Sequence, residues 1–467
     1  PDGIIDFNND RCIGCKSCMQ ACPYDALYID PETHTAAKCN YCAHRVDIGL
    51  EPACVNICPE QAIISGDMEN PDTEIAQLLA RQQVKTRKPE KGTNPNVYYI
   101  NGDDASLNPT ASDRSHTYIW SSQSTGVGHY AKFAESLTEG KDLIAMVQDL
   151  QGHKPGSKLA TYGGGSEKDA SPKQIEVIMN AGKTRRVYDT PDKGILWGWE
   201  VSSYVLTKAI SAGAFLVLFL GTLMGLVPSA ELTWATGIVS IVFLLLTGLL
   251  LVIDLDRPDR FLYVLLRPQW GSWLVRGGYF VTLFGGLLTA WLAGNFLGID
   301  VLVTIGFWGS AVFALLVAVY TAFLFAQAKG RDFWQSPSMA LHMLVHSLMA
   351  GAGVLLISSL FISIDAEWVD LLGQVLLVSI VINLLVMLVE LTITHPTEDA
   401  HRVVTMIVKG RYARLFWWGV VVTTNLLPLI LLVAGSQWVV PAAGLSVLGI
   451  FITEKIWIEA PQRIPLT

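Results

Sequence analysis

The stretch CIGCKSCMQACP, residues 12–23, places three cysteines two residues apart and a fourth directly before a proline. A second set of four lies between residues 39 and 58, and its last cysteine also precedes a proline. Three thiolates at this spacing can bind one 4Fe-4S cluster, while the cysteine beside the proline ligates a neighbouring cluster. The expected ligand sets are Cys12, Cys15, Cys18 and Cys58 for one cluster, and Cys39, Cys42, Cys54 and Cys22 for the other. The pattern therefore predicts two 4Fe-4S clusters that form a one-electron relay.

Two other chemistries use clustered cysteines. A zinc site needs only paired CxxC motifs, and a disulfide framework needs an even number of cysteines. Neither requires a third and a fourth cysteine at this spacing with trailing prolines, so we favour the interpretation as clusters.

The apolar residues are distributed unevenly along the chain. The chain has 467 residues, of which 51% are hydrophobic, and a mean hydropathy of +0.39. It is therefore more apolar than an ordinary soluble protein. Residues 1 to about 195 have the composition of a soluble protein, whereas windows of 18 or more nearly uncharged residues recur from about residue 200. The net charge of −8 and the lack of a basic run argue against nucleic-acid binding.

These apolar windows predict an integral membrane bundle, because each is long enough to cross a bilayer as a helix. The expected spans are 204–227, 234–253, 274–298, 301–327, 338–364, 368–393, 415–435 and 437–458. The expected fold is an α+β ferredoxin-like two-cluster domain followed by an all-α integral membrane bundle of eight transmembrane helices. We expect domains at 1–66, at 67–195 and at 196–467. The middle one is a connector, with an amphipathic helix at 129–150, that packs on the cluster domain or on a partner.

An even number of spans puts both ends of the bundle on the side of the cysteine domain. The loops on that side contain eleven basic residues: Arg257, Arg260, Arg267, Arg276, Lys329, Arg331, Arg402, Lys409, Arg411, Arg414 and Arg463. The opposite loops contain no lysine or arginine. By the positive-inside rule, the cluster domain faces the cytoplasm from the cell inner membrane. A second interpretation is that these basic residues dock the cysteine domain, on whichever side it lies.

Two parts of the sequence resemble known families. Residues 11–30 and 38–63 (RCIGCKSCMQACPYDALYID and KCNYCAHRVDIGLEPACVNICPEQAI) resemble the last two cysteine motifs of the iron-sulfur subunits in the complex iron-sulfur molybdoenzyme family. Those subunits usually carry four such motifs, so a motif upstream could supply a fourth ligand, and the crossed pairing stays open. Residues 251–279 and 389–419 (LVIDLDRPDRFLYVLLRPQWGSWLVRGGY and VELTITHPTEDAHRVVTMIVKGRYARLFWWG) resemble the polysulfide-reductase-type (NrfD) quinone-binding membrane subunit, an eight-helix protein without haem.

A quinone exchanges two electrons together with two protons, so its site needs proton acceptors and hydrogen-bond donors near the clusters. Ionisable residues in or beside spans are costly and mark such sites. The candidates are Asp254 with Arg257 and Arg260 behind it, Lys208, His342, His346 and Glu390, and more weakly Asn383, Tyr320, Asn425 and Glu454. The resemblance points to Asp254, because the aspartate of the family's Asp-x-x-Arg-Pro stretch lies at the cluster-facing quinone pocket.

Each candidate also has a structural interpretation. Asp254 can staple a loop through ion pairs with the two arginines, and Lys208 can extend its stem along apolar surface. His342 and His346 lie one turn apart on one helical face, where either can be an interhelical hydrogen bonder. Haem ligation requires two histidines that approach from opposite faces, so we expect no haem.

These observations predict an electron-transfer subunit of a membrane-bound quinone oxidoreductase. Its clusters would relay electrons between a partner catalytic subunit and menaquinone or ubiquinone. The resemblance implies a molybdopterin-type partner, with further iron-sulfur or cytochrome subunits as additional partners. Two alternatives are a redox-driven proton-translocating module and a structural anchor without its own quinone site.

Overall fold

The computed structural model of this chain describes residues 4–103, 107–108, 193–393, 395 and 397–466. The described residues of Pro1–Pro52 and Ile195–Ile464 form one compact unit, and those of Ala53–Gly194 and Pro465–Thr467 form a second. Most of the expected connector, including the helix predicted at 129–150, lies outside the described residues. The domain boundaries at residues 66 and 195 stay predictions.

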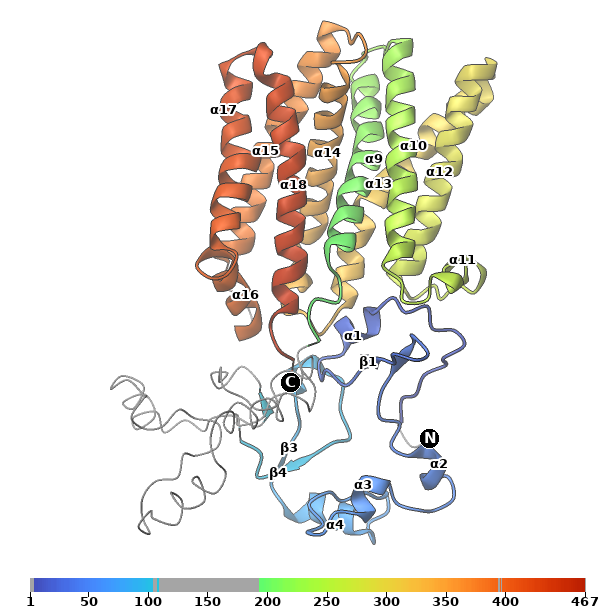
Figure 1. Cartoon of the computed structure of the whole chain (residues 1–467), viewed down its shortest axis with the longest axis vertical. Coiled ribbons are helices and arrows are strands. Elements are labelled where there is room, and N and C mark those ends of the chain that lie inside the picture. The colour runs from blue at the N-terminus through green and yellow to red at the C-terminus, as the bar shows by residue number, and fades with distance from the viewer. Residues whose placement is uncertain (1–3, 104–106, 109–192, 394, 396, 467) are drawn as a thin grey trace, which may run out of the picture. The chain divides into compact units, whose positions relative to one another are not determined.

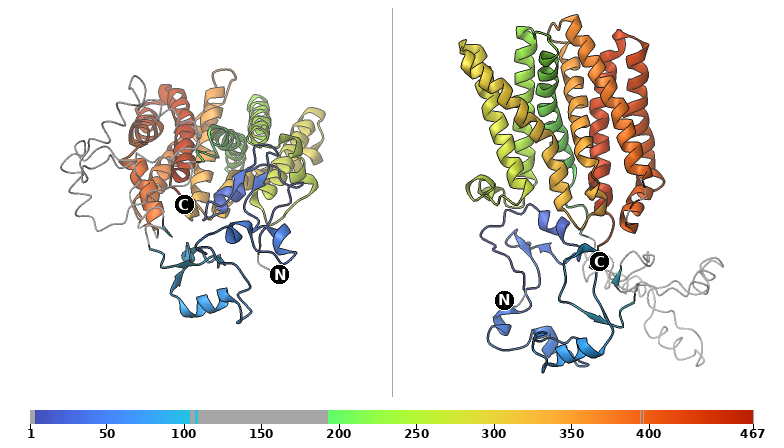
Figure 2. Two further views of the ribbon diagram at one scale, coloured as in Figure 1. Left: turned by 60° about the horizontal axis from the view of Figure 1, so that its bottom comes forward. Right: turned by 180° about the vertical axis from the view of Figure 1, so that it is seen from behind.

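Among the described residues, eight helices are long and apolar enough to cross a membrane, which confirms the expected number. They run side by side in Figures 1 and 2. These helices are α9 (Trp199–Leu223), α10 (Ala230–Ile253), α12 (Trp273–Leu297), α13 (Asp300–Gln327), α14 (Met339–Ser358), α15 (Ala366–Thr392), η5 with α17 (Leu415–Leu426 and Leu427–Ala434) and α18 (Val439–Gln462).

The first unit also contains short elements outside the long helices. They are α1 (Ser17–Ala21), β1 (Tyr28–Ile29) paired antiparallel with β2 (Ala36–Ala37), α2 (Ala43–Val46), η3 (Pro258–Arg260), α11 (Tyr263–Leu266), η4 (Asp332–Gln335), α16 (Glu398–Val408) and η6 (Ser436–Trp438). The loop after α10 and the loop after α13 lie at the same end of the bundle as α1 (Figure 1). The cysteine motif at residues 12–22 therefore contacts one end of the bundle.

Local residue chemistry determines where several helices begin and end. The hydroxyl of Ser229 accepts a hydrogen bond from the backbone N–H of Leu232 at 3.2 Å, which caps the start of α10. Thr397 caps α16 in the same way, by accepting from Ala400 at 3.4 Å. Gly298 ends α12 in the left-handed region, with φ of 67°.

The seventh span begins with a π-helical segment, η5. The side chains of Thr424 and Asn425 donate to carbonyls five residues earlier, at 2.9 and 2.8 Å. Pro428 follows in α17 and has no N–H to donate. Such wide turns often occur at functional sites, and this one places the side chain of Asn425 inside the bundle, fully buried.

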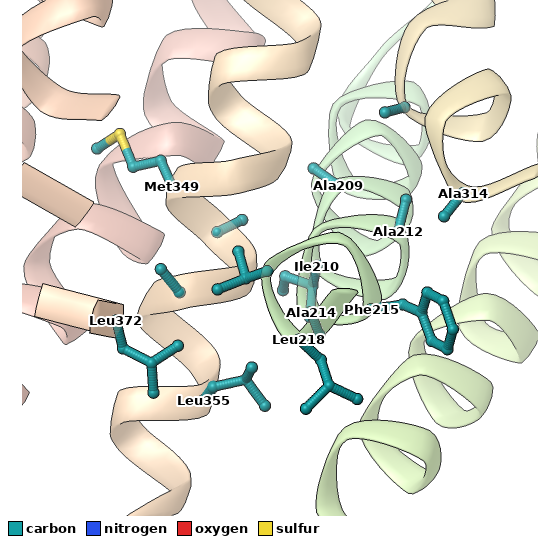
Figure 3. Packing of buried hydrophobic residues seen from close by; sticks show 14 of the residues in the cluster. Ala209, Ile210, Ala212, Ala214, Phe215, Leu218, Ala314, Met349, Leu355 and Leu372 are labelled. Carbon is teal, nitrogen blue, oxygen red and sulfur yellow. The ribbon is translucent and has the colours of Figure 1, made fainter. Parts of the chain in front are cut away.

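Small residues let the central helices approach closely. Figure 3 shows Ala209, Ala212 and Ala214 of α9 between helices α14 and α13. A Cβ on Gly213 of α9 would overlap the backbone of α14, and a Cβ on Gly351 of α14 would overlap the backbone of α9. Helix association in membranes depends on such close packing, because apolar side chains gain little there by leaving lipid.

The second unit contains α3 (Ala53–Asn56), α4 (Glu74–Arg81), η1 (Pro89–Lys91) and strands β3 (Val84–Lys85) and β4 (Tyr99–Ile100). The strands pair antiparallel, with Val84 opposite Ile100. The hydroxyl of Thr73 caps α4. Both units together match the expected fold class of a small α+β cysteine-rich part and a helical bundle.

Candidate functional site

The backbone of the first cysteine loop turns sharply between its ligands. Gly14 and Lys16, which separate the cysteines of this loop, both adopt the left-handed region, with φ of 69° and 59°. Alternating conformations of this kind bring successive N–H groups to one side of the chain. A Cβ on Gly14 would lie 2.7 Å from the Cβ of Asp256, so only glycine fits there. The loop is therefore shaped to present several groups to one centre.

The donor set fits iron-sulfur clusters. All eight cysteines carry free thiols. Backbone N–H groups point at three of the sulfur atoms: Ala36 to Cys12, Tyr41 to Cys39 and Ala62 to Cys58, at 3.4, 3.4 and 3.2 Å. Thiolates are the ligands that these clusters use, and hydrogen bonds to sulfur help to set their potentials. Cys54 and Cys58 belong to the second unit and the other six to the first, so the crossed pairing stays a prediction.

The loop that follows α10 lies along the first cysteine loop. The ammonium of Lys16 donates to the backbone oxygen of Asp254 at 2.8 Å. It also lies 3.7 Å from the carboxylate of Asp254 and 3.6 Å from that of Asp256. The backbone N–H groups of Asp256 and Arg257 donate to the carbonyls of Gly14 and Ile13, each at 3.3 Å. The cysteine motif and the end of a membrane helix are thus held in direct contact.

The Asp254 carboxylate is well shielded from water, with a side chain only 12% exposed. Burial raises the pKa of Asp254 to about 7, and the nearby carboxylates of Glu200 and Asp256 act in the same direction, whereas Lys16 lowers it. An acid with this pKa can take up or release a proton near neutral pH. This property suits a residue that exchanges protons with a quinone.

Among the described residues, neither Arg257 nor Arg260 makes a side-chain hydrogen bond to Asp254. Arg257 pairs with Asp259 at 2.9 Å and donates to the carbonyl of Thr33 at 3.0 Å. Arg260 donates to the carbonyls of Asn9 and Cys12, at 2.6 and 3.1 Å. The side chain of Arg260 therefore holds the start of the cysteine loop, and that of Arg257 holds the turn between β1 and β2. A contact of either arginine with a quinone stays a prediction.

A buried polar group also joins α1 to the bundle. Gln20 donates to the side-chain oxygen of Gln462 at 2.6 Å and accepts from Nε of Arg331 at 3.0 Å. Arg331 also donates to the carbonyls of Pro461 and Ile464, at 3.1 and 2.7 Å. Gln20 is fully buried, and Gln462 and Arg331 are 6% and 9% exposed. We call these three residues the docking cluster, because they connect the cysteine motif to helix α18 and to the loop after α13.

A Gln20→Leu variant is expected to loosen the cysteine motif from the bundle. The change removes the donor to Gln462 and the acceptor of Arg331 Nε, and each buried polar group that loses a partner costs about 1–3 kcal/mol. The visible absorbance of bound clusters should therefore bleach faster on heating than in the parent. The matched control is Gln374→Leu, on the exposed face of α15. Equal bleaching rates in all three proteins would show that the docking cluster does not hold the motif.

Deeper in the bundle, the two histidines of α14 each contact a carboxylate from another helix. Nδ1 of His342 lies 3.1 Å from Oε2 of Glu390 on α15. Nδ1 of His346 lies 2.7 Å from Oε1 of Glu454 on α18. The imidazole centroids are 4.2 Å apart, and no side chain of the four is more than 4% exposed. We call these four residues the histidine cluster.

The surroundings of the histidine cluster supply further polar contacts. Glu390 accepts hydrogen bonds from the hydroxyl of Ser338 at 2.7 Å and from the indole N–H of Trp457 at 3.1 Å. Nε2 of His346 lies 3.1 Å from Oδ1 of Asn383. In the described part of the chain, His342, His346 and Glu454 form a group that could hold a metal ion, with one ligand atom from each and all three atoms within 4.8 Å.

Lys208 makes its hydrogen bonds to helix α13. It is fully buried, so its ammonium does not extend to solvent. It donates to the hydroxyl of Thr321 at 2.7 Å and to the carbonyl of Ala318 at 3.1 Å, both on α13. It interacts electrostatically with Glu454. Within the described residues, no hydrogen bond or ion pair joins Asp254 directly to the histidine cluster. The candidates predicted from the sequence therefore form two separate sites, one at Asp254 beside the cysteine loop and one at the histidine cluster.

Several residues of these sites were not expected from the sequence. Lys16, Gln20 and Gln462 are not among the candidates that the sequence indicates, and Arg331 is indicated only as one of the basic loop residues. A lysine between two cysteine ligands and a glutamine at the end of an apolar span are signals that could have identified two of them. Glu454 and Asn383 were only weak candidates, yet both contact His346.

Comparisons with known proteins agree with this geometry. Residues 190–464 match the family model described as polysulphide reductase, NrfD, and residues 1–68 match that of a 4Fe-4S dicluster domain. One subunit of the tetrathionate reductase of Salmonella typhimurium is 47% identical over 121 residues, which are 26% of this chain and 48% of the relative. One component of the polysulfide reductase of Wolinella succinogenes is 43% identical over 100 residues, 21% of this chain and 52% of the relative.

Protein NrfC of Escherichia coli is 41% identical over 99 residues, 21% of this chain and 44% of the relative. The chain thus spans about half the length of the curated relatives it matches. The matches confirm the predicted iron-sulfur domain and the multi-pass membrane bundle.

Proposed function

This protein belongs to the polysulphide reductase, NrfD, family, and from that premise we propose that it relays electrons between 4Fe-4S clusters and a quinone bound beside Asp254. The observation that carries the proposal is the contact of Lys16 with Asp254. Lys16 lies between two cysteines of the first motif, and Asp254 ends membrane helix α10. Electron transfer falls off steeply with distance, so a quinone at this end of the bundle has the shortest path to the cysteine motif.

Two clusters are proposed, held by the crossed cysteine sets that the spacing predicts. When bound, they accept and release single electrons. The chain's own residues hold and shape the loop: Gly14 permits its turn, and Arg260 fixes the carbonyls of Asn9 and Cys12. The docking cluster keeps α1 on the bundle. These contacts hold the first cysteine motif against the end of the bundle.

Protons must move when a quinone changes its redox state. Asp254 is the proposed proton acceptor at the quinone, with Lys16 holding its backbone and balancing its charge. His342 is the fourth residue of α14 and Glu390 is the third residue from the end of α15, and both carry protons in this proposal. His346 and Lys208 lie further inside and extend this set of candidate proton carriers.

A catalytic partner protein completes the proposed complex. Relatives of the cysteine part are subunits of tetrathionate and polysulfide reductases, which supports a molybdopterin-type enzyme as the partner. The basic loops at the α1 end support a cytoplasmic position for the cysteine domain at the cell inner membrane. The quinone is menaquinone or ubiquinone, and the same residues serve electron flow in either direction.

An Asp254→Asn variant tests this site. Reoxidation of dithionite-reduced protein by a menaquinone analogue should slow roughly a hundredfold, because general acid–base groups contribute factors of about 10²–10⁴. Stopped-flow absorbance of the clusters measures the rate, and the iron content should equal that of the parent. The matched control is Asp300→Asn, at the exposed start of α13. If the parent and Asp254→Asn reacted at equal rates, the quinone would bind elsewhere. If the parent did not react at all, the membrane bundle would be a structural anchor without its own quinone site.

A further inference from the structure

His346 is enclosed by polar groups from other helices and is sealed from water. One ring nitrogen faces Glu454 Oε1 at 2.7 Å and the other faces Asn383 Oδ1 at 3.1 Å. His346 is 1% exposed, and the other two residues are fully buried. Each contact must therefore be satisfied by the protein itself, because no solvent donor reaches it.

A chain of amide contacts determines which nitrogen of His346 carries hydrogen. Nδ2 of Asn425 donates to the carbonyl of Val420 at 2.8 Å, and a carbonyl can only accept. Asn425 therefore presents its Oδ1 to Asn383, whose Nδ2 donates to it at 2.9 Å. This orientation turns Oδ1 of Asn383 toward Nε2 of His346, so Nε2 must be an N–H donor. The π-helical turn that brings Asn425 inward thus sets the tautomer of a histidine on another helix.

With hydrogen on Nε2, a neutral His346 would turn a lone pair at Nδ1 toward a carboxylate oxygen only 2.7 Å away. Two acceptors at this distance repel each other, and burial increases the cost. A hydrogen between Nδ1 and Oε1 removes the conflict. We propose that His346 and Glu454 share one stored proton, which makes the pair a proton-binding site inside the membrane bundle.

The charges around the pair support one extra proton. The described titratable groups around the pair are Tyr204 and Lys208 on α9, with Tyr320 of α13 beside Lys208, His342 on α14 and Glu390 on α15. Two of these groups, Glu390 and Glu454, are carboxylates that each lie beside a histidine. Negative charge is expensive inside a membrane bundle, and a proton held between His346 and Glu454 lowers that cost.

The stored proton has a second acceptor close by. Glu390 accepts from Ser338 and Trp457, so it acts as a carboxylate and orients Nδ1–H of His342 toward itself. Nε2 of His342 then carries a lone pair, and within the described residues this atom has no hydrogen-bond partner. It lies 3.9 Å from Oε1 of Glu454. Transfer breaks an N–H or O–H bond in the pair, forms an N–H bond on His342 and moves no electrons.

A metal ion is the other species that could join these atoms. Two ligands at about 2.0–2.2 Å from one tetrahedral ion lie roughly 3.3–3.6 Å apart. The Nδ1–Oε1 separation of 2.7 Å is shorter and matches a hydrogen bond. The geometry therefore favours a proton. The proposal goes beyond the electron relay, which requires no proton store at this depth.

The test uses the full chain in lipid nanodiscs at pH 8, with its histidines labelled with nitrogen-15. Solid-state NMR should show an imidazolium resonance that disappears in His346→Gln, or infrared spectroscopy should show a carboxylic-acid C=O band that disappears in Glu454→Gln. Either result places the shared proton in the pair. The matched control, Glu459→Gln, lies on the same helix and should retain the signal.

Two results would overturn the proposal. The first is a neutral His346 together with an absent carboxylic-acid band in the parent. The second is one equivalent of a metal other than cluster iron, measured by mass spectrometry and lost in Glu454→Gln. If Glu454→Gln fails to assemble, His346→Gln gives the same decision, because it removes the partner and must abolish or shift the signal. None of these readouts depends on quinone reactivity, so a failed electron relay and a failed proton site remain distinguishable.

Discussion

A Cys15→Ala variant is expected to lose one 4Fe-4S cluster and therefore about half of the protein's iron and acid-labile sulfide. Cys15 is the middle ligand of the first motif, and its backbone carbonyl accepts a hydrogen bond from the indole of Trp197 at 3.2 Å. Four thiolates hold such a cluster, so three leave one iron without a protein ligand. Chemical analysis of iron and sulfide, with low-temperature EPR after reduction, measures the loss.

The matched control for this variant is Met19→Leu. Met19 lies on α1 between two ligands of the same motif and is 4% exposed, but it offers no thiolate. Met-to-Leu exchange conserves volume and usually costs less than about 1.5 kcal/mol. Iron content should match that of the parent. Unchanged iron in Cys15→Ala would contradict the ligand assignment, and complete loss of iron would mean that the two clusters do not assemble independently.

The second large effect concerns helix packing. Gly351→Ala is expected to destabilise the bundle, because the added Cβ overlaps the backbone of α9. Overpacking costs about 1–3 kcal/mol, and the upper end applies where the neighbour is backbone and cannot rotate away. The midpoint of thermal unfolding in detergent should fall, and the fraction of monodisperse protein after heating should fall with it.

Gly373→Ala on α15 is the matched control, with an expected effect of opposite sign. An added Cβ there meets no atom within 4 Å. Alanine favours a helix over glycine by roughly 0.5–1 kcal/mol, so this variant should be as stable as the parent or slightly more so. If both variants behaved alike, close packing of α9 on α14 would not be a source of stability.

Much of this architecture follows from residue patterns that act locally. Cysteine spacing is a property of one loop, and hydropathy depends only on the length of an apolar segment, so both could be predicted. Boundaries were less accurate: the first span was expected from residue 204, but α9 begins at Trp199. The short helix α16 was not predicted, because its eleven residues follow the sixth span without an apolar window of their own.

The pairings between distant residues could not be predicted in this way. Lys16 and Asp254 are 238 positions apart, and His346 and Glu454 are 108 positions apart. Whether they meet depends on how eight helices pack, which the period of one helix does not reveal. The inward position of Asn425 could not be predicted either. Pro428 indicates that the helix is irregular there, but it does not indicate in which direction the side chain of Asn425 points. Polar residues inside a span can be recognised in the sequence because burying them is costly. The residues that they contact cannot be recognised in this way.

The central claim is that electrons pass between the clusters and a quinone at the Asp254 end of the bundle. The most direct measurement is low-temperature EPR of the purified full chain, run in both directions: oxidised protein mixed with a menaquinol analogue, and dithionite-reduced protein mixed with the oxidised analogue. Both directions are needed because a menaquinol analogue cannot reduce a cluster of very low potential, whereas that cluster, once reduced, can still pass electrons to the oxidised analogue. We expect the reduced-cluster signal to appear in the first mixture or to disappear in the second, at rates that Asp254→Asn slows. A signal that changes in neither mixture would contradict the proposed relay.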